Sequence, residues 1–230
     1  MTTIADNLQH VRQRIEAACA AAGRDVNEVT LLAVSKTFGP DAVREAFSAG
    51  QRAFGENYIQ EAVEKIAALG DLPLQWHCIG PIQSNKTRWV AAHFDWAHTV
   101  DRLKIAQRLS EQRRADQPPL QICIQVNIDG GPTKAGVAPE ATADLAREVA
   151  QLPRLALRGL MTIPEPAADF AAQKAVHLRA RALFDQLREQ GLALDTLSMG
   201  MTADLEAAIA AGSTMVRVGT AIFGARPAAL

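Results

Sequence analysis

The apolar positions of this 230-residue chain follow two periods that alternate along its length. Residues 3–22 repeat apolar side chains at helical spacing, with threonines that can cap the start and Gly23 just past the end. After this segment, short apolar runs of strand length alternate with amphipathic segments of helix length. The pattern predicts one leading helix followed by regular strand–helix units.

Eight strands are predicted, and the longer segments between them are predicted helices. The strands cover residues 29–34, 52–55, 74–79, 96–100, 120–128, 155–163, 196–199 and 215–218. The helices cover residues 40–49, 57–69, 85–93, 101–115, 139–151, 169–190 and 203–211. Strands that alternate with helices in this way are typical of a parallel sheet.

This order of elements predicts an α/β fold, a single (β/α)8 TIM barrel with an extra N-terminal helix. The alternative is an open doubly wound sheet, in which a glycine-rich phosphate turn would follow the first strand. Residues 35–40 do not have that composition. No internal repeat, linker or low-complexity tract divides the chain, so we expect residues 1–230 to form one domain.

Composition narrows the functional classes. Hydrophobic residues make up 48% of the chain, charged residues 21%, and the net charge is -1, which gives no electrostatic footprint for nucleic acid. We find neither a signal-peptide pattern nor an apolar run of membrane-spanning length. Cys19, Cys78 and Cys123 are far apart in apolar segments. We therefore expect buried thiols in a reducing compartment and no metal site. A cytoplasmic location fits these expectations.

Lys36 is the first residue whose position points to chemistry. It ends the apolar run 31–36, where an ammonium must be solvated, paired or deprotonated. One interpretation is a lysine that extends to the rim of the sheet. The other is an amine nucleophile toward a carbonyl, because a lysine in such a place can have a lowered pKa.

The loops after the seventh and eighth strands have the composition of a phosphate site. Barrels often bind phosphate with these two loops, and small residues there let backbone N–H groups approach the anion. Ser198 with Gly200, and Gly219 with Thr220, supply small residues and hydroxyl donors in both loops. The alternative is ordinary turn chemistry at strand ends.

Three residues after the seventh strand need a separate interpretation. Thr202 has a role that competes with phosphate binding, because it can cap the helix predicted from residue 203. Asp204 and Glu206 suit the first turn of that helix but would repel an anion, so we expect them to point away from it.

Arg217 lies inside the apolar strand 215–218 and needs an acceptor, because an unpaired buried guanidinium is very costly. The acceptor is either a structural carboxylate or a ring nitrogen of a bound cofactor. Lys36, the phosphate loops and Arg217 together match pyridoxal 5′-phosphate. Arginine keeps its proton and leaves the ring nitrogen unprotonated, which favours holding the cofactor over demanding carbanion chemistry.

At these residues the chain resembles the YggS/PROSC family of pyridoxal phosphate homeostasis proteins. The matching motifs cover residues 34–37, 54–58, 77–86, 159–164, 198–202 and 217–224, and the likeness extends over nearly the whole chain. The resemblance implies a barrel like the amino-terminal domain of alanine racemase, with a covalent aldimine at Lys36. It also implies a ring-side contact from Asn57 and a pyridine-nitrogen contact from Arg217. The phosphate contacts that it implies are Ser198, Gly200, Gly219 and Thr220, and Met199 is a further implied cofactor-binding residue.

The family is regarded as a carrier and regulator of pyridoxal phosphate that affects amino-acid balance, without an established catalytic reaction. The resemblance therefore implies intracellular pyridoxal phosphate homeostasis and no enzymatic activity. Its implied partners are the cofactor itself and apo-enzymes that depend on it, with no nucleic acid and no membrane. A barrel that needs no second domain is compatible with a monomer.

The chain departs from the family pattern at three places. Phe38 stands where family members often carry a second lysine, and Cys78 stands where phenylalanine is usual. The loop 129–133 is less acidic and less serine-rich than in the family, although Lys134 and Gly136 keep their places. Lys134 is either a second amine near the mouth of the site or a solvated loop lysine.

Two enzymatic alternatives remain. An amino-acid racemase of the alanine racemase type needs an acid or base on each face of the substrate, and Lys36 serves only one. Tyr58 or His77 could supply the other, but the chain ends just past the eighth strand, without the second domain that carries this group in alanine racemase. A Schiff-base aldolase would use the lysine and the phosphate loops, but it gives no reason for Arg217.

Overall fold

The computed structural model describes residues 2–132 and 134–225 of the chain. Parallel strands form a closed barrel in the order β1-β2-β3-β4-β5-β6-β7-β8. The strands are β1 (Thr30–Val34), β2 (Ala53–Glu56), β3 (Gln75–Cys78), β4 (Trp96–Val100), β5 (Leu120–Val126), β6 (Leu155–Thr162), β7 (Thr196–Ser198) and β8 (Met215–Val218). The barrel closes where Leu32 of β1 lies in register with Arg217 of β8. The predicted barrel is therefore confirmed.

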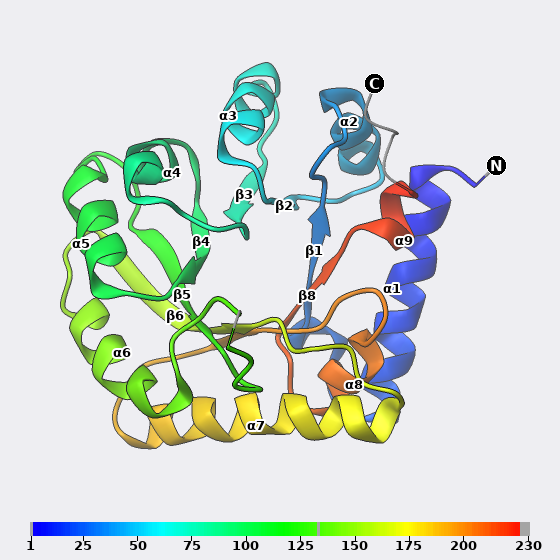
Figure 1. Cartoon of the computed structure of the whole chain (residues 1–230). Coiled ribbons are helices and arrows are strands. Elements are labelled where there is room, and N and C mark those ends of the chain that lie inside the picture. The colour runs from blue at the N-terminus through cyan, green and yellow to red at the C-terminus, as the bar shows by residue number, and fades with distance from the viewer. Residues whose placement is uncertain (1, 133, 226–230) are drawn as a thin grey trace.

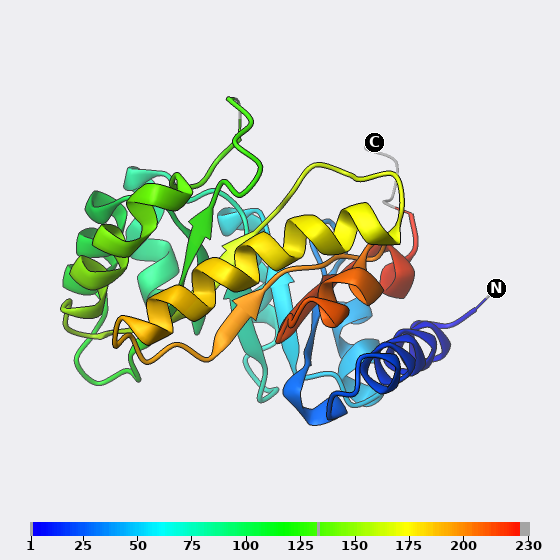
Figure 2. The same ribbon diagram turned by 90° about the horizontal axis from the view of Figure 1, so that it is seen from below.

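Helices surround the strands as an outer ring (Figure 1). They are α1 (Ile4–Ala21), α2 (Pro40–Ser48), α3 (Ile59–Ala68), α4 (Thr87–His93), α5 (Leu103–Gln112), α6 (Thr142–Ala150), α7 (Phe170–Glu189), α8 (Leu205–Ala210) and α9 (Thr220–Phe223). Short 3-10 segments occur at η1 (Val26–Glu28), η2 (Ser84–Lys86) and η3 (Pro139–Ala141). In Figure 2 the loops that follow β5 and β6 project from the same end of the barrel.

The leading helix α1 is held at both ends by local signals. Its first turn is a capping box, in which the Thr3 hydroxyl accepts from the Asp6 amide and the Asp6 carboxylate accepts from the Thr3 amide, both at 3.1 Å. Gly23 follows the helix with φ 65°, a conformation that glycine adopts readily. The helix packs beside α8 and α9 (Figure 1), which confirms the predicted N-terminal addition to the barrel.

The alternation of side chains along each strand produces two apolar layers. One layer lies between the strands and the helices and includes Ala33 and Val216. The other is a smaller cluster, made of Leu32, Val34, Ala53, Ile79, Trp96, Cys123, Met161 and Met215. Arg217 follows Met215 by two positions, and Lys36 follows Val34 by two positions. Arg217 therefore lies on the side of β8 that forms the smaller cluster, and Lys36 lies in the turn after β1.

Every predicted strand and helix occurs among the described residues in the predicted order, with ends that differ by at most three residues. The short helix α9 and the 3-10 segments were not predicted. The helix predicted over residues 203–211 is shorter, because α8 has Asp204 as its N-cap. Thr202 is therefore not the capping residue. Met1, Thr133 and residues 226–230 lie outside the described residues, so the assignment of 1–230 to one domain stays a prediction.

Candidate functional site

A cavity of about 310 Å³, which we call the lysine cavity because Lys36 lines it, opens where β1, β2 and β8 end. Five residues proposed from the sequence line it, namely Lys36, Asn57, Arg217, Gly219 and Thr220. The other lining residues are Val34, Phe38, Ile79, Ile163, Met201, Thr202, Ala203 and Gly224. Its position at the carboxyl ends of the strands is where barrels carry their sites, and its volume suits a small organic ligand.

The backbone on the amino side of Lys36 is held by buried hydrogen bonds. Ser35 is fully buried, and its hydroxyl donates to Glu56 Oε1 at 2.7 Å. The ammonium of Lys65 donates to the Ser35 carbonyl oxygen at 2.9 Å and to Glu56 Oε1 at 2.6 Å. Ser35, the residue before Lys36, is therefore held through both its hydroxyl and its carbonyl oxygen.

The backbone on the carboxyl side of Lys36 turns sharply. Thr37 has φ 68°, in the left-handed region that a β-branched residue rarely adopts. Its amide donates to Glu61 Oε1 at 2.8 Å, and the same oxygen accepts from Lys65 at 3.1 Å. One buried lysine and two carboxylates thus hold both flanks of Lys36, and none of these contacts was predicted from the sequence.

Asn57 lies at the end of β2 and faces the cavity. Its Oδ1 atom is buried and has no hydrogen-bond partner within the part of the chain that the structure describes. Gly80, in the loop after β3, lies so close that an added Cβ would be 2.0 Å from the Asn57 carbonyl oxygen. The glycine is required for this approach, and Asn57 lines the cavity while its amide oxygen stays buried and unsatisfied.

Arg217 is 4% exposed and presents its guanidinium to the cavity from inside the barrel. Its Nη1 donates to Ser198 Oγ and its Nη2 donates to the Thr162 carbonyl oxygen, each at 2.8 Å. Burial lowers the pKa of this group to about 10. Both hydrogen-bond acceptors are neutral, so among the described residues no carboxylate is a hydrogen-bond partner of Arg217, although the charge of Asp204 opposes the lowering of its pKa.

The loops after β7 and β8 contribute unequally. Gly219 and Thr220 line the cavity as predicted, whereas Ser198, Met199 and Gly200 are fully buried and are not among its lining residues. Ser198 Oγ is already engaged by Arg217 and by His98 Nδ1, which lies 3.0 Å away. The roles of these three buried residues toward a phosphate stay predictions.

Three consecutive residues, Met201, Thr202 and Ala203, also line the cavity; the sequence analysis offered Thr202 as a helix cap and did not single out the other two. Gly200 brings them there, because it has φ 98° and an added Cβ would be 2.5 Å from the Cβ of Ala208 in α8. The signal for this part of the wall is the hydroxyl of Thr202, two residues after Gly200 in the same loop.

The two acidic residues near this loop make contacts of their own. Asp204 accepts from the Met201 amide through Oδ1 at 2.8 Å, and its Oδ2 lies 2.8 Å from His177 Nε2 in α7. Glu206 forms an ion pair with Arg14 of α1 at 2.7 Å. Neither residue lines the cavity, as expected for a site that takes an anion.

Two of the departures from the family pattern also have defined surroundings. Phe38 lines the cavity and stacks on Phe223 of α9 with ring centroids 5.2 Å apart, where the family often has a lysine. Cys78 is fully buried, and burial raises the pKa of its thiol to about 12, so it serves packing rather than redox chemistry.

Lys134 does not line the cavity. Its ammonium donates to the Ile163 carbonyl oxygen at 2.8 Å and forms ion pairs with Glu165 at 3.2 Å and Asp129 at 3.7 Å. The residue therefore joins the loops after β5 and β6, and neither interpretation offered by the sequence describes it fully. Thr133, in the loop 129–133, lies outside the described residues.

Neither candidate for a second acid or base of a racemase lines the cavity. Tyr58 is 49% exposed and directly precedes α3. His77 is fully buried, with its Nδ1 2.8 Å from His98 Nε2. Among the described residues that line the cavity, the side chains that can carry charge are Lys36 and Arg217.

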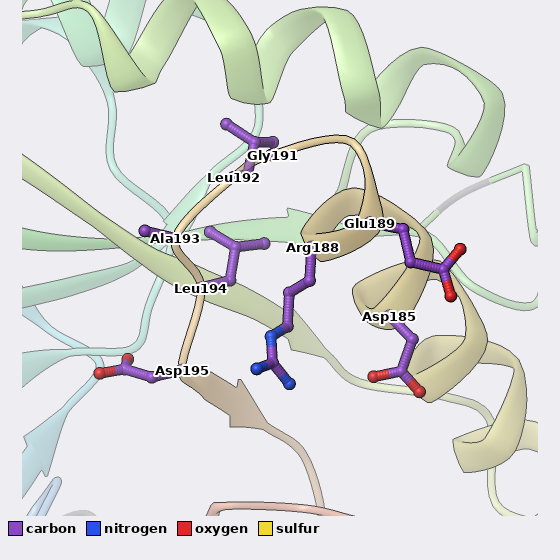
Figure 3. Close-up of a pocket in the computed structure, with 8 residues that line it drawn as sticks. All are labelled: Asp185, Arg188, Glu189, Gly191, Leu192, Ala193, Leu194 and Asp195. Atoms are coloured by element: carbon purple, nitrogen blue, oxygen red, sulfur yellow. The ribbon is translucent and has the colours of Figure 1, made fainter.

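A larger hollow of about 740 Å³ lies at the turn from α7 into β7. Figure 3 shows Asp185, Arg188 and Glu189 of the helix beside the turn 191–195. This turn is at the amino end of β7, the opposite end of the barrel from the lysine cavity. Its charged side chains point in different directions, and none of them is a residue proposed from the sequence, so the cavity lined by Lys36 remains the candidate site.

Two features are absent from the described residues. No helix there is long and apolar enough to cross a membrane. No group of three or more His, Cys, Asp or Glu side chains in residues 2–132 and 134–225 is placed to hold a metal ion.

The closed barrel, with a lysine at the end of β1 and a buried arginine in β8, has the architecture of the alanine racemase N-terminal domain. The family model described as "Alanine racemase, N-terminal domain" matches residues 4–227. A pyridoxal phosphate homeostasis protein of Pseudomonas aeruginosa is 62% identical over 226 residues, which covers 98% of this chain and 97% of the relative. The chain belongs to the family of pyridoxal phosphate homeostasis proteins.

Two solved structures place the fold. The structure of PipY of Synechococcus elongatus with pyridoxal phosphate bound is 39% identical, has a TM-score of 0.85, and is matched over 96% of this chain and 100% of that one. An alanine racemase of Clostridium difficile is 14% identical with a TM-score of 0.73, over 94% of this chain and 57% of that one. The second likeness shows a common barrel fold and no more.

Proposed function

We propose that the chain binds pyridoxal 5′-phosphate in the lysine cavity and acts in intracellular pyridoxal phosphate homeostasis. The observation that carries the proposal is the guanidinium of Arg217, which is buried at the cavity wall and hydrogen-bonded to neutral acceptors. A buried cation without a carboxylate in its hydrogen bonds favours a ligand that supplies an electron-rich acceptor. Lys36, on the wall of the same cavity, supplies the amine for an aldehyde.

The donor set fits this cofactor. Asn57 lines the cavity where a ring-side contact is proposed, and Thr202 and Thr220 line the wall formed by the loops after β7 and β8. When bound, pyridoxal phosphate supplies an aldehyde that condenses with the Lys36 amine with release of water. The buried segment before Met201 positions Arg217 and the loop after β7 through hydrogen bonds; it consists of Ser198, Met199 and Gly200.

The same geometry favours holding the cofactor over turnover. Arg217 has only donor groups and keeps its proton, so it stabilises an unprotonated ring nitrogen and weakens the ring as an electron sink. Racemisation would also need a second acid or base, and the described lining offers only Lys36 for proton transfer. We therefore propose a carrier and regulator rather than an enzyme.

The family supports the biological part of the proposal. Its Pseudomonas aeruginosa member is named for pyridoxal phosphate homeostasis, and the Synechococcus elongatus structure has pyridoxal phosphate bound. By extension, we propose that this chain works in the cytoplasm as one domain and as a monomer. Its partners would then be pyridoxal phosphate and the apo-enzymes that receive it.

The test compares the visible absorbance of wild type with that of Lys36→Ala after incubation with pyridoxal phosphate, before and after borohydride. Lys104→Ala, on the exposed side of α5, is the matched lysine control. We expect a yellow band and covalent trapping in the wild type and the control but not in Lys36→Ala. A wild type that stays colourless would exclude the site. A chiral assay on alanine and serine, cleared of contaminating racemase, then decides between carrier and racemase.

A further inference from the structure

A continuous chain of hydrogen bonds runs through the barrel from the cavity to an exposed strand end. Arg217 Nη1 donates to Ser198 Oγ at 2.8 Å, and this oxygen lies 3.0 Å from His98 Nδ1. His98 Nε2 lies 2.8 Å from His77 Nδ1, and His77 Nε2 lies 3.0 Å from Gln75 Oε1. Gln75 is exposed and begins β3, so the chain joins the cavity wall to solvent at the opposite end of the barrel.

The first link fixes the direction of the second. Arginine carries only donors, so Ser198 Oγ accepts from Arg217. Ser198 is fully buried, so its hydroxyl proton needs an acceptor, and the other partner of its oxygen is His98 Nδ1. The hydroxyl therefore donates to His98 Nδ1, which places the single ring proton of a neutral His98 on Nε2.

The remaining links follow in the same direction. His98 Nε2–H donates to His77 Nδ1, so His77 also carries its ring proton on Nε2 and donates it to Gln75 Oε1. Each link then has one donor and one acceptor. The reverse order would place an unprotonated His77 nitrogen against an amide oxygen and leave the Ser198 proton without an acceptor.

Both rings must be neutral for this arrangement, and their surroundings keep them so. Each is 0% exposed, and burial lowers the pKa of His77 to about 3. Burial, the neighbouring His77 and the charge of Arg217 together lower the pKa of His98 well below its ordinary value. A protonated His98 would turn an N–H toward Ser198 and remove the acceptor of its hydroxyl proton.

We propose that His98 and His77 are positioning residues for Arg217. Their shared tautomer turns the Ser198 hydroxyl proton away from the guanidinium, so that the oxygen accepts from Nη1 while the Thr162 carbonyl accepts from Nη2. The guanidinium is thereby held at the cavity wall by neutral groups, with its charge directed to the pyridine nitrogen of a bound cofactor. The identity of the ligand rests on the proposed function, whereas the tautomers belong to the protein before any ligand binds.

The first experiment measures the histidine ring nitrogens of the ligand-free protein by ¹⁵N NMR at about neutral pH. The signals are assigned with His77→Gln and His98→Gln. We expect both rings to be neutral with the proton on Nε2. A proton on Nδ1 of either ring, or a doubly protonated ring, would overturn the proposal whether or not the protein binds pyridoxal phosphate.

The second experiment compares cofactor release and the visible spectrum of the loaded protein in two variants of His98. His98→Leu removes the acceptor of the Ser198 proton, whereas the amide oxygen of His98→Gln can replace it. We expect release from His98→Leu to be faster by about fivefold, the effect of one hydrogen bond, with a displaced absorbance maximum. His98→Gln should recover part of both changes, which a purely structural role would not predict.

Met215→Leu is the matched control, because Met215 is buried in the smaller apolar cluster and its side chain lies outside the hydrogen-bond chain. We expect its release rate and spectrum to match those of the wild type. Release from His98→Leu at the wild-type rate with an unchanged spectrum would overturn the proposal. A wild type that binds no pyridoxal phosphate would instead contradict the proposed function, and the NMR measurement would still decide the tautomers.

Discussion

The ammonium of Lys65 lies 2.6 Å from Glu56 Oε1, and both side chains are almost fully inaccessible to solvent. Burial raises the pKa of Glu56, and the nearby Lys65 opposes that change. The pair also holds the peptide before Lys36 through hydrogen bonds to Ser35. A buried ion pair outside the cavity therefore orients the residue on which the proposed chemistry depends.

Removing one partner of this pair should be costly. Lys65→Met would leave Glu56 buried without its counter-charge, and we expect the free energy of unfolding to fall by ~3–5 kcal/mol. Urea unfolding measures the change. The control is Arg44→Met, which breaks the exposed ion pair between Arg44 and Asp71 and should change stability little. Equal effects of the two variants would contradict the importance of burial.

Gly80→Ala tests the close approach between the loop after β3 and Asn57. The added Cβ would meet the Asn57 carbonyl at 2.0 Å, so the backbone must move, at a cost of ~1–3 kcal/mol in unfolding free energy. Thermal and urea unfolding, together with pyridoxal phosphate retention, measure the outcome. Gly70→Ala is the matched control, since its Cβ would meet only the Ala67 carbonyl at 3.6 Å. Wild-type stability and retention in Gly80→Ala would contradict the expectation.

The sequence was sufficient for the barrel and for five of the thirteen residues that line the cavity. Apolar runs bounded by glycine and proline located the strands, and parallel strand ends meet at one end of a barrel. Lys36, Asn57 and Arg217 therefore converge as predicted. Thr202 was offered as a helix cap instead, because the sequence did not show that Ser198, the end of β7, is turned into the barrel toward His98.

The contacts that hold the site could not be predicted in the same way. Lys65 lies on an amphipathic helix, where a lysine is usually solvated, and only the packing of α3 on the barrel shows that it is buried. The pairing of His77 with His98 depends on the register between β3 and β4, which places His77 opposite Trp96. Register and helix orientation are tertiary properties that a single sequence does not determine.

Arg217→Met tests the ring-nitrogen contact. The variant keeps apolar bulk but loses the charged donors toward Ser198, Thr162 and the cavity, so we expect pyridoxal phosphate to be retained about tenfold less tightly. Equilibrium dialysis and the visible spectrum measure the effect. An unchanged affinity and spectrum would show that Arg217 does not contact the cofactor.

The ion pair between Glu206 and Arg14 predicts a pH dependence of stability. The hydrogen bond from Arg14 is the main cause of a lowered Glu206 pKa in the folded protein, so the contribution is present above the ordinary pKa of 4.5. It is lost as the pH falls through the lowered pKa. Urea unfolding from about pH 6 to about pH 3 should show a shallower acid decline for Glu206→Gln than for the wild type. Parallel declines would contradict the expectation.

Phe38→Lys tests whether position 38 reaches the proposed cofactor. Phe38 lines the cavity and stacks on Phe223, so the substitution should lower the unfolding free energy by ~0.5–1.5 kcal/mol through loss of the aromatic pair. In a Lys36→Ala background the new amine faces the same cavity, and we expect it to restore part of the borohydride-trapped pyridoxal phosphate. Phe38→Leu in that background is the control and should restore none. Mass spectrometry of the trapped peptide identifies the modified residue, and a label on any lysine other than position 38 would contradict the prediction.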